Sequence, residues 1–199
     1  MDAVKIANKI SKEHGTIKNV YFLACGGSLV DLYSGYYFLR AESAVMDAQW
    51  IPAREFALTP PRKLGKDSLL VICSHSGKTK ECLEAAKAGM EAGAAVVTMT
   101  HAPGSACDTD EWISIVYDWA PGVKEAEKPQ GIVLRLLNEL MKIQEPGYGL
   151  YDKIAEGFDK IDEIIAEAVK DQQNAAWLFA EKYSEEPNLY IMASGASYS

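Results

Sequence analysis

Three hydroxyl side chains lie close together in the stretch Ser74-His-Ser-Gly-Lys-Thr79. Ser74, Ser76 and Thr79 supply short hydrogen-bond donors, and Gly77 lets the backbone approach a ligand closely. The apolar run before this loop predicts a buried strand, and the amphipathic run after it predicts a helix over residues 79–92. Free amides at a helix N-terminus and the helix dipole both favour an anion. We therefore predict a phosphate site at Ser74, His75, Ser76, Gly77 and Thr79.

Two other interpretations of this loop are available. Ser76 and Thr79 could simply cap the following helix, which is a common use of such residues. Gly77-Lys78-Thr79 also has the ending of a nucleotide-binding P-loop, but that motif needs a glycine where Ile72 stands. The P-loop interpretation therefore fails, and the capping interpretation stays open at this point.

A second loop of the same construction occurs near the N-terminus. Residues 20–25 predict another buried strand, Gly26-Gly27-Ser28 follows it, and residues 29–41 predict a helix. In an open parallel sheet, loops at the carboxyl ends of the strands gather on one edge and bind ligands there. Gly26, Gly27 and Ser28 are therefore added to the predicted phosphate site.

The remaining elements must hold these two loops side by side. Residues 2–14 and 131–143 predict helices, and residues 49–52, 94–100 and 112–117 predict strands. Strands that alternate with helices at this spacing indicate a parallel sheet covered on both faces. We expect an α/β fold with three αβα layers and five parallel strands.

Acidic side chains near the predicted cleft are weaker candidates for chemistry. Glu55 follows the strand at residues 49–52 and could face the cleft, although an exposed carboxylate in a first helical turn is the simpler interpretation. Residues 118–130 form a charged loop that suits the rim of an active site. Whether Glu125 or Glu127 in that loop faces a substrate is open.

The C-terminal part of the chain predicts a change of organisation. We expect residues 1–150 to form the first domain, and residues 151–186 predict a connector of one or two helices. Residues 187–199 repeat the strand and loop of the first domain, since Met192-Ala-Ser-Gly-Ala-Ser197 parallels Leu23-Ala-Cys-Gly-Gly-Ser28. We expect the start of a truncated second domain; alternatively, the last strand adds to the sheet of a neighbouring chain.

Composition excludes several classes of partner. The 199 residues include 48% hydrophobic side chains and carry a net charge of −8, and no basic run offers a surface for nucleic acid or an anionic membrane. The four cysteines are widely spaced and suggest neither a disulfide framework nor a zinc site. There is no signal peptide or membrane-length apolar run, so we expect a soluble cytoplasmic protein. No motif implies a metal or nucleotide cofactor, and we expect none.

The two loops resemble the phosphate-binding loops of the sugar isomerase (SIS) domain family. That family has the signature Ser-x-Ser-Gly-x-Thr, and Ser74, Ser76, Gly77 and Thr79 match its fixed positions. The segment from Gln49 to Phe56 and the tandem arrangement are similar to double-domain members. The resemblance implies a sugar 6-phosphate ligand held by Ser28, Ser74, Ser76 and Thr79, and a homodimer.

Within the family, the chain looks most similar to fructosamine-6-phosphate deglycases, which release glucose 6-phosphate and an amine. In such enzymes the catalytic glutamate and histidine lie in the second SIS copy, so their positions here are unknown and this chain alone is expected to be inactive. The loop at residues 125–131 departs from glucosamine-6-phosphate synthase. A phosphosugar isomerase and a non-catalytic phosphosugar-sensing regulator are the alternatives.

Overall fold

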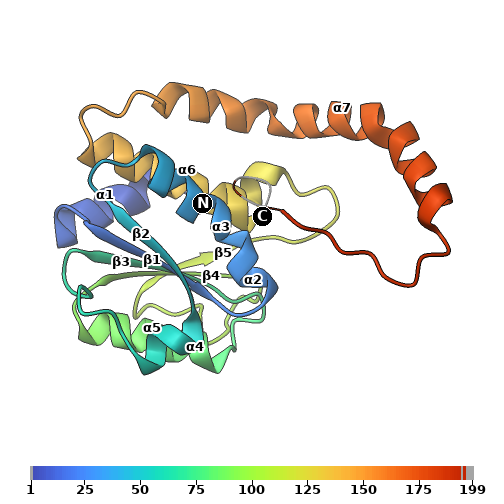
Figure 1. Cartoon of the computed structure of the whole chain (residues 1–199). Coiled ribbons are helices and arrows are strands. Elements are labelled where there is room, and N and C mark those ends of the chain that lie inside the picture. Colours follow the sequence, from blue (N-terminus) through green and yellow to red (C-terminus); the bar gives the residue numbers. More distant parts are fainter. Residues whose placement is uncertain (1, 194, 196–199) are drawn as a thin grey trace.

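Five parallel strands form a single sheet in the order β2-β1-β3-β4-β5 (Figure 1). The computed structural model describes residues 2–193 and 195. The strands are β1 (Asn19–Ala24), β2 (Asp47–Pro52), β3 (Ser68–Cys73), β4 (Ala95–Thr100) and β5 (Ile113–Val116). β1, β3 and β4 are buried along their whole length, which explains their near-continuous apolar sequences.

Helices cover both faces of this sheet, so the three-layer αβα fold is confirmed (Figure 1). One core lies between the sheet and the helices α1 (Ala3–His14), α2 (Gly27–Asp31), α3 (Tyr33–Glu42) and α6 (Pro129–Gln144). The other lies between the sheet and the helices α4 (Ala53–Leu58) and α5 (Lys80–Glu91). A short 3-10 helix, η1 (Glu125–Glu127), precedes α6.

The helix boundaries differ from the prediction in two places that have local causes. The helix predicted over residues 29–41 is two helices, because the chain turns at Leu32 between α2 and α3. α6 begins at Pro129, two residues before the predicted start, since proline suits the first position of a helix. Both changes leave the predicted order of elements intact.

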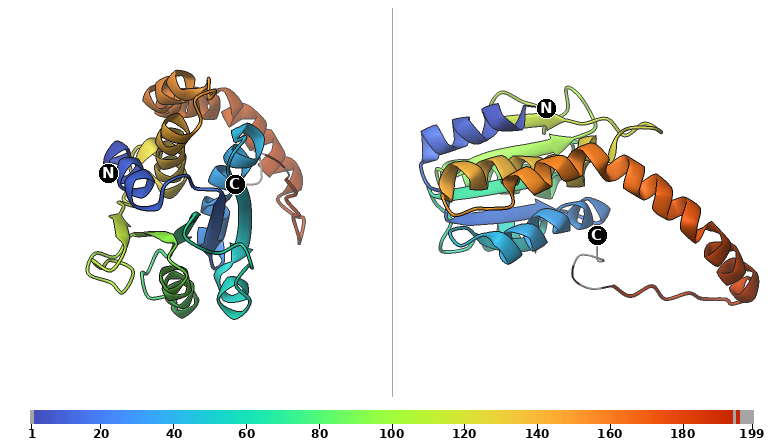
Figure 2. Two further views of the ribbon diagram at one scale, coloured as in Figure 1. Left: turned by 90° about the vertical axis from the view of Figure 1, so that its left-hand side faces the viewer. Right: turned by 90° about the horizontal axis from the view of Figure 1, so that it is seen from above.

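The connector is one helix, α7 (Tyr151–Tyr183), which packs against α6 near its start and then extends away from the sheet (Figure 2). Ile154 near its start packs against the first core, but none of its residues is fully buried. Further along, Trp177 is 71% exposed. The packing of α7 is therefore confined to its N-terminal part.

The strand predicted over residues 188–193 is absent from the structure. These residues are exposed and form no ladder with any described residue; Ile191 is 95% exposed. A strand needs backbone partners on a neighbouring strand, and none of the described residues supplies them here. Of the predicted loop Ser194–Ser199, only Gly195 belongs to the described residues. The division into domains at residues 1–150, 151–186 and 187–199 stays a prediction.

Candidate functional site

The two predicted loops begin next to each other at the carboxyl edge of the sheet. Ala24 at the end of β1 pairs with Cys73 at the end of β3, and Cys73 pairs with Met99 near the end of β4. The loops after β1, β3 and β4 therefore leave the sheet from neighbouring positions. This is the edge at which parallel α/β folds place their ligands.

The hydroxyl groups of the Ser74–Thr79 loop do not cap α5. Thr79 occupies the N-cap position, but its side chain makes no capping hydrogen bond and instead contacts the Ser74 hydroxyl at 2.8 Å. Ser76 is exposed, and its hydroxyl accepts a hydrogen bond from the Lys78 amide at 3.3 Å. The first-turn amides of α5 are thus left without a side-chain acceptor, which is the condition for holding an anion.

A second loop holds the Ser74–Thr79 loop from the side of β4. The His101 amide donates to the His75 carbonyl at 3.2 Å, and the Cys107 amide donates to the Gly77 carbonyl at 3.1 Å. Gly77 has a φ of 63°, and a Cβ there would lie 1.9 Å from the Ser105 hydroxyl oxygen. Glycine is therefore required at position 77 both by the backbone conformation and by the close approach of Ser105.

Gly26, Gly27 and Ser28 lie at the expected edge. Gly26 has a φ of 61° and precedes α2, which includes Gly27 and Ser28. Ser28 is half-buried, and hydrogen bonding from its side chain opposes the rise in the pKa of Cys73. Burial and the nearby Asp31 raise the pKa of Cys73 to about 12, so this thiol is protonated at neutral pH and acts as a hydrogen-bonding group.

A cluster of four aromatic side chains, which was not expected from the sequence, borders the Ser74–Thr79 loop. The rings of His75 and His101 stack with centroids 4.9 Å apart, and His75 Nδ1 lies 3.1 Å from the Tyr117 hydroxyl. Trp119 meets the His75 ring edge-on at 5.7 Å. Burial is the main cause that raises the pKa of Tyr117, so its hydroxyl stays protonated and orients His75.

Asp31 and Gln130 join α2 to the start of α6 beside this aromatic cluster. The Gln130 side-chain amide donates to the Asp31 carboxylate at 2.7 Å. Burial raises the pKa of Asp31, and the nearby His75 opposes that rise. His101 and Tyr117 directly follow β4 and β5, so the rule that strand ends share an edge could have found them. Asp31 and Gln130 carry no comparable sequence signal, since Asp31 lies inside the predicted helix 29–41 and Gln130 is the last residue of the predicted loop 118–130.

Known proteins share both sequence and fold with this chain. No family model matches the chain. Fructosamine deglycase FrlB from Bacillus subtilis is 31% identical over 183 residues, which are 92% of this chain and 56% of FrlB. The crystal structure of a Salmonella typhimurium protein named as a phosphosugar isomerase superposes with a TM-score of 0.88 at 31% identity, covering 98% of this chain and 58% of that protein. The chain belongs to the SIS domain family.

A second SIS structure supports the same assignment. A Bacillus subtilis protein, also named as a phosphosugar isomerase, superposes with a TM-score of 0.83 at 29% identity and covers 98% of this chain and 63% of that protein. This SIS chain therefore spans little more than half the length of the relatives it matches.

The acidic candidates of the sequence analysis lie outside the aromatic cluster and the two loops. Glu55 is exposed in the first turn of α4, as the simpler interpretation expected. Glu125 forms an ion pair with Lys128, and its amide donates to Asp162 of α7 at 2.9 Å. Glu127 is exposed. The geometry therefore assigns Glu125 to the contact between η1 and α7.

Within the described residues, no group of three or more histidine, cysteine or acidic side chains is arranged to hold a metal ion. No described helix has the length and hydropathy needed to cross a membrane.

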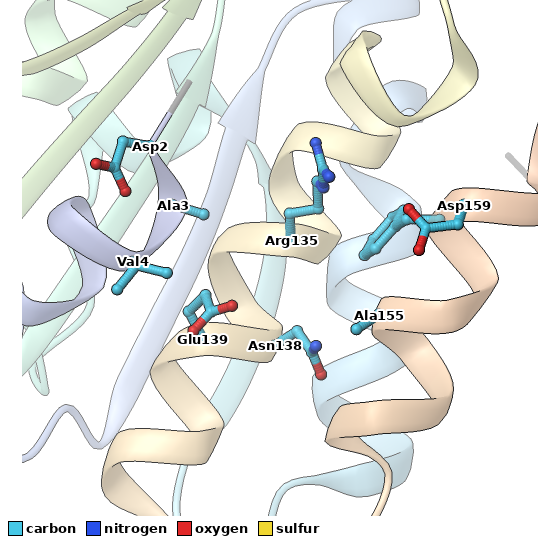
Figure 3. Close-up of a pocket in the computed structure, with 9 residues that line it drawn as sticks. Asp2, Ala3, Val4, Arg135, Asn138, Glu139, Ala155 and Asp159 are labelled. Carbon is cyan, nitrogen blue, oxygen red and sulfur yellow. The ribbon is translucent and has the colours of Figure 1, made fainter.

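A cavity of about 420 Å³ opens elsewhere, between α1, α6 and α7 (Figure 3). Two of its lining side chains have partners: Arg135 lies 5.2 Å from the Phe158 ring centroid, and Glu139 accepts a hydrogen bond from Tyr151 at 2.8 Å. None of the residues of the two SIS loops lines it. The cavity is a gap between helices, distinct from the strand-end site.

Proposed function

We propose that this chain is the phosphate-binding half of a fructosamine-6-phosphate deglycase. The observation that carries the proposal is the Ser74–Thr79 hydroxyl pair at the uncapped N-terminus of α5. The similarity to FrlB over 92% of the chain supports a deglycase over other SIS activities. The substrate class is a ketose 6-phosphate that carries an amine on C1, and water converts it to glucose 6-phosphate and the free amine.

The phosphate is held by neutral donors. Ser28, Ser74, Ser76 and Thr79 supply hydroxyl groups, and the backbone from His75 to the first turn of α5 supplies amides. An anion at this position gains from the positive end of the α5 dipole. The chain has a net charge of −8, so attraction must come from these local dipoles and not from the overall field of the protein.

The reaction also needs groups that move protons between C1, C2 and the sugar oxygens. By the resemblance stated above, these are a glutamate and a histidine of a second SIS domain. We therefore expect the 199-residue chain to bind a phosphosugar without converting it, and to form a homodimer. Measurable glucose 6-phosphate release by a verified 199-residue product would contradict this expectation.

Thermal unfolding with and without glucose 6-phosphate tests the binding site, with glucose as the matched ligand lacking phosphate. Ligand at about 100 times its dissociation constant would stabilise the chain by about 2.7 kcal/mol. Ser74→Ala should abolish this response. Ser114→Ala is the matched control, because Ser114 also makes one 2.8 Å side-chain hydrogen bond but lies on the edge strand β5.

Two outcomes would redirect the proposal. Equal stabilisation by glucose and glucose 6-phosphate would reject a phosphate site. A response to glucose 6-phosphate that Ser74→Ala leaves unchanged would move the site away from the loop after β3. Assays of a double-domain relative with fructose 6-phosphate conjugates of lysine, asparagine and a simple amine would separate a deglycase, which releases glucose 6-phosphate, from an isomerase or a sensor.

A further inference from the structure

Trp119 is a large aromatic side chain that stays exposed to solvent at the carboxyl edge of the sheet. It lies two residues after Tyr117, which directly follows β5, and it is 46% exposed. Its ring meets the His75 ring edge-on, with centroids 5.7 Å apart. His75 belongs to the Ser74–Thr79 loop, so Trp119 lies one ring beyond the proposed phosphate site.

Contacts on the backbone and on the ring hold Trp119 in this position. The Asp118 carboxylate accepts hydrogen bonds from the Trp119 amide at 2.7 Å and from the Ala120 amide at 3.2 Å. The buried ring of Tyr117 meets the Trp119 ring edge-on at 6.3 Å. A side chain that is already ordered loses little conformational freedom when a ligand binds, and this favours affinity.

The indole N–H distinguishes Trp119 from two other tryptophans of the chain. Trp50 Nε1 donates to the Leu29 carbonyl at 2.6 Å, and Trp112 Nε1 donates to the Cys107 carbonyl at 3.1 Å. Among the described residues, none accepts a hydrogen bond from Trp119 Nε1. Trp119 therefore offers a hydrogen-bond donor as well as an exposed apolar surface.

The sugar of a hexose phosphate has the complementary features. Its carbon atoms carry C–H groups that form apolar patches, and the hydroxyl groups around them accept hydrogen bonds. An indole joins a large apolar ring to a single N–H donor, so it can bury the C–H groups and donate to one hydroxyl. Inorganic phosphate has no C–H groups, and it can use only the hydroxyls and amides of the two loops.

We propose that Trp119 binds the sugar of the phosphosugar and makes the site selective for a sugar phosphate over inorganic phosphate. This proposal rests on the proposed function, because it needs the phosphate at Ser74, Ser76 and Thr79. From there the sugar extends past His75 and lays its C–H groups on the exposed part of the Trp119 ring. One sugar hydroxyl accepts the hydrogen bond of Trp119 Nε1. Trp119 is thus a residue for specificity, while the two loops hold the phosphate.

Titration calorimetry of the whole chain with glucose 6-phosphate and with inorganic phosphate tests the proposal. Trp119→Ala should weaken the binding of glucose 6-phosphate about tenfold and leave the binding of inorganic phosphate unchanged. Trp119→Phe keeps an aromatic ring but removes the N–H donor, so its loss should be smaller. Trp177→Ala is the matched control, because that tryptophan is 71% exposed on α7 and should not affect either ligand.

Four results would overturn the assignment of Trp119. The Trp119→Ala variant could bind glucose 6-phosphate as tightly as the unchanged chain, which would show that the ring does not touch the sugar. An equal loss for both ligands would show that Trp119 acts only by supporting the Ser74–Thr79 loop. A smaller oligomer of Trp119→Ala in size-exclusion chromatography would assign the exposed ring to a subunit contact. Equal affinity of the unchanged chain for both ligands would remove the selectivity itself.

The same titrations separate this assignment from the proposed function. If the unchanged chain binds inorganic phosphate and glucose 6-phosphate equally, the phosphate site stands and only the role of Trp119 is refuted. If the unchanged chain binds neither ligand, the phosphate site is refuted, and the sugar contact is refuted with it.

Discussion

Gly77→Ala is expected to be the most damaging single-methyl change in the loop after β3. Two costs add at this position. The φ of 63° is a left-handed conformation, which costs a residue with a Cβ about 1–2 kcal/mol. The new Cβ would also lie 1.9 Å from the Ser105 hydroxyl oxygen, 2.5 Å from the Ser105 Cβ and 2.7 Å from the Thr100 hydroxyl oxygen.

The steric clash cannot be relieved at a small cost in free energy, because the groups that the new methyl meets belong to short and buried side chains. Ser105 and Thr100 are 9% and 0% exposed, and the Thr100 hydroxyl already donates to the His75 carbonyl at 3.3 Å. Overpacking of this kind costs about 1–3 kcal/mol. Together with the backbone cost, Gly77→Ala should lower the free energy of unfolding by about 2–5 kcal/mol.

Gly104→Ala separates the two costs. Gly104 has a similar φ of 68°, but no atom lies within 4 Å of its ideal Cβ. This variant should lose only the backbone part, about 1–2 kcal/mol. Urea denaturation followed by tryptophan fluorescence gives both values, provided that the dependence on denaturant is unchanged between variants. Equal losses for the two variants would refute the tight contact between Gly77 and Ser105.

Three further changes test other parts of the site. Tyr117→Phe removes the 3.1 Å contact with His75 Nδ1 and should lower the free energy of unfolding by about 1 kcal/mol. The thermal stabilisation by glucose 6-phosphate should also become smaller. An unchanged stabilisation would show that the aromatic cluster is not part of the phosphate site. Gly131→Ala should lower the free energy of unfolding by about 1–3 kcal/mol, because a Cβ there would lie 2.4 Å from a backbone oxygen of η1. An unchanged free energy of unfolding in the same assay would show that η1 moves to make room for the methyl group. Asp31→Asn should raise the free energy of unfolding at neutral pH. Burial raises the pKa of Asp31 in the folded state, so the folded protein loses stability as the pH rises from about 4 through the folded pKa. Asparagine does not ionise, so the variant should not show this loss. Denaturation midpoints measured between about pH 4 and pH 8 should diverge with rising pH, and parallel curves would count against a raised pKa.

The amino-acid sequence was sufficient for several features that depend on neighbours along the chain. Buried parallel strands are short apolar runs, so β1, β3 and β4 could be located within a residue or two. The loop glycines and hydroxyls directly follow these runs, and that order alone predicts a ligand edge. The same local logic failed at residues 188–193, because a strand also requires a backbone partner that the run itself does not contain.

Tertiary structure decided the features that join distant parts of the chain. The aromatic cluster takes His75, His101 and Tyr117 from the ends of three strands, and only the order β3-β4-β5 makes them neighbours. Whether Thr79 capped α5 was likewise open in the sequence, since the Ser74 hydroxyl competes for the same side chain. Such choices depend on distances across the sheet, which local patterns do not encode.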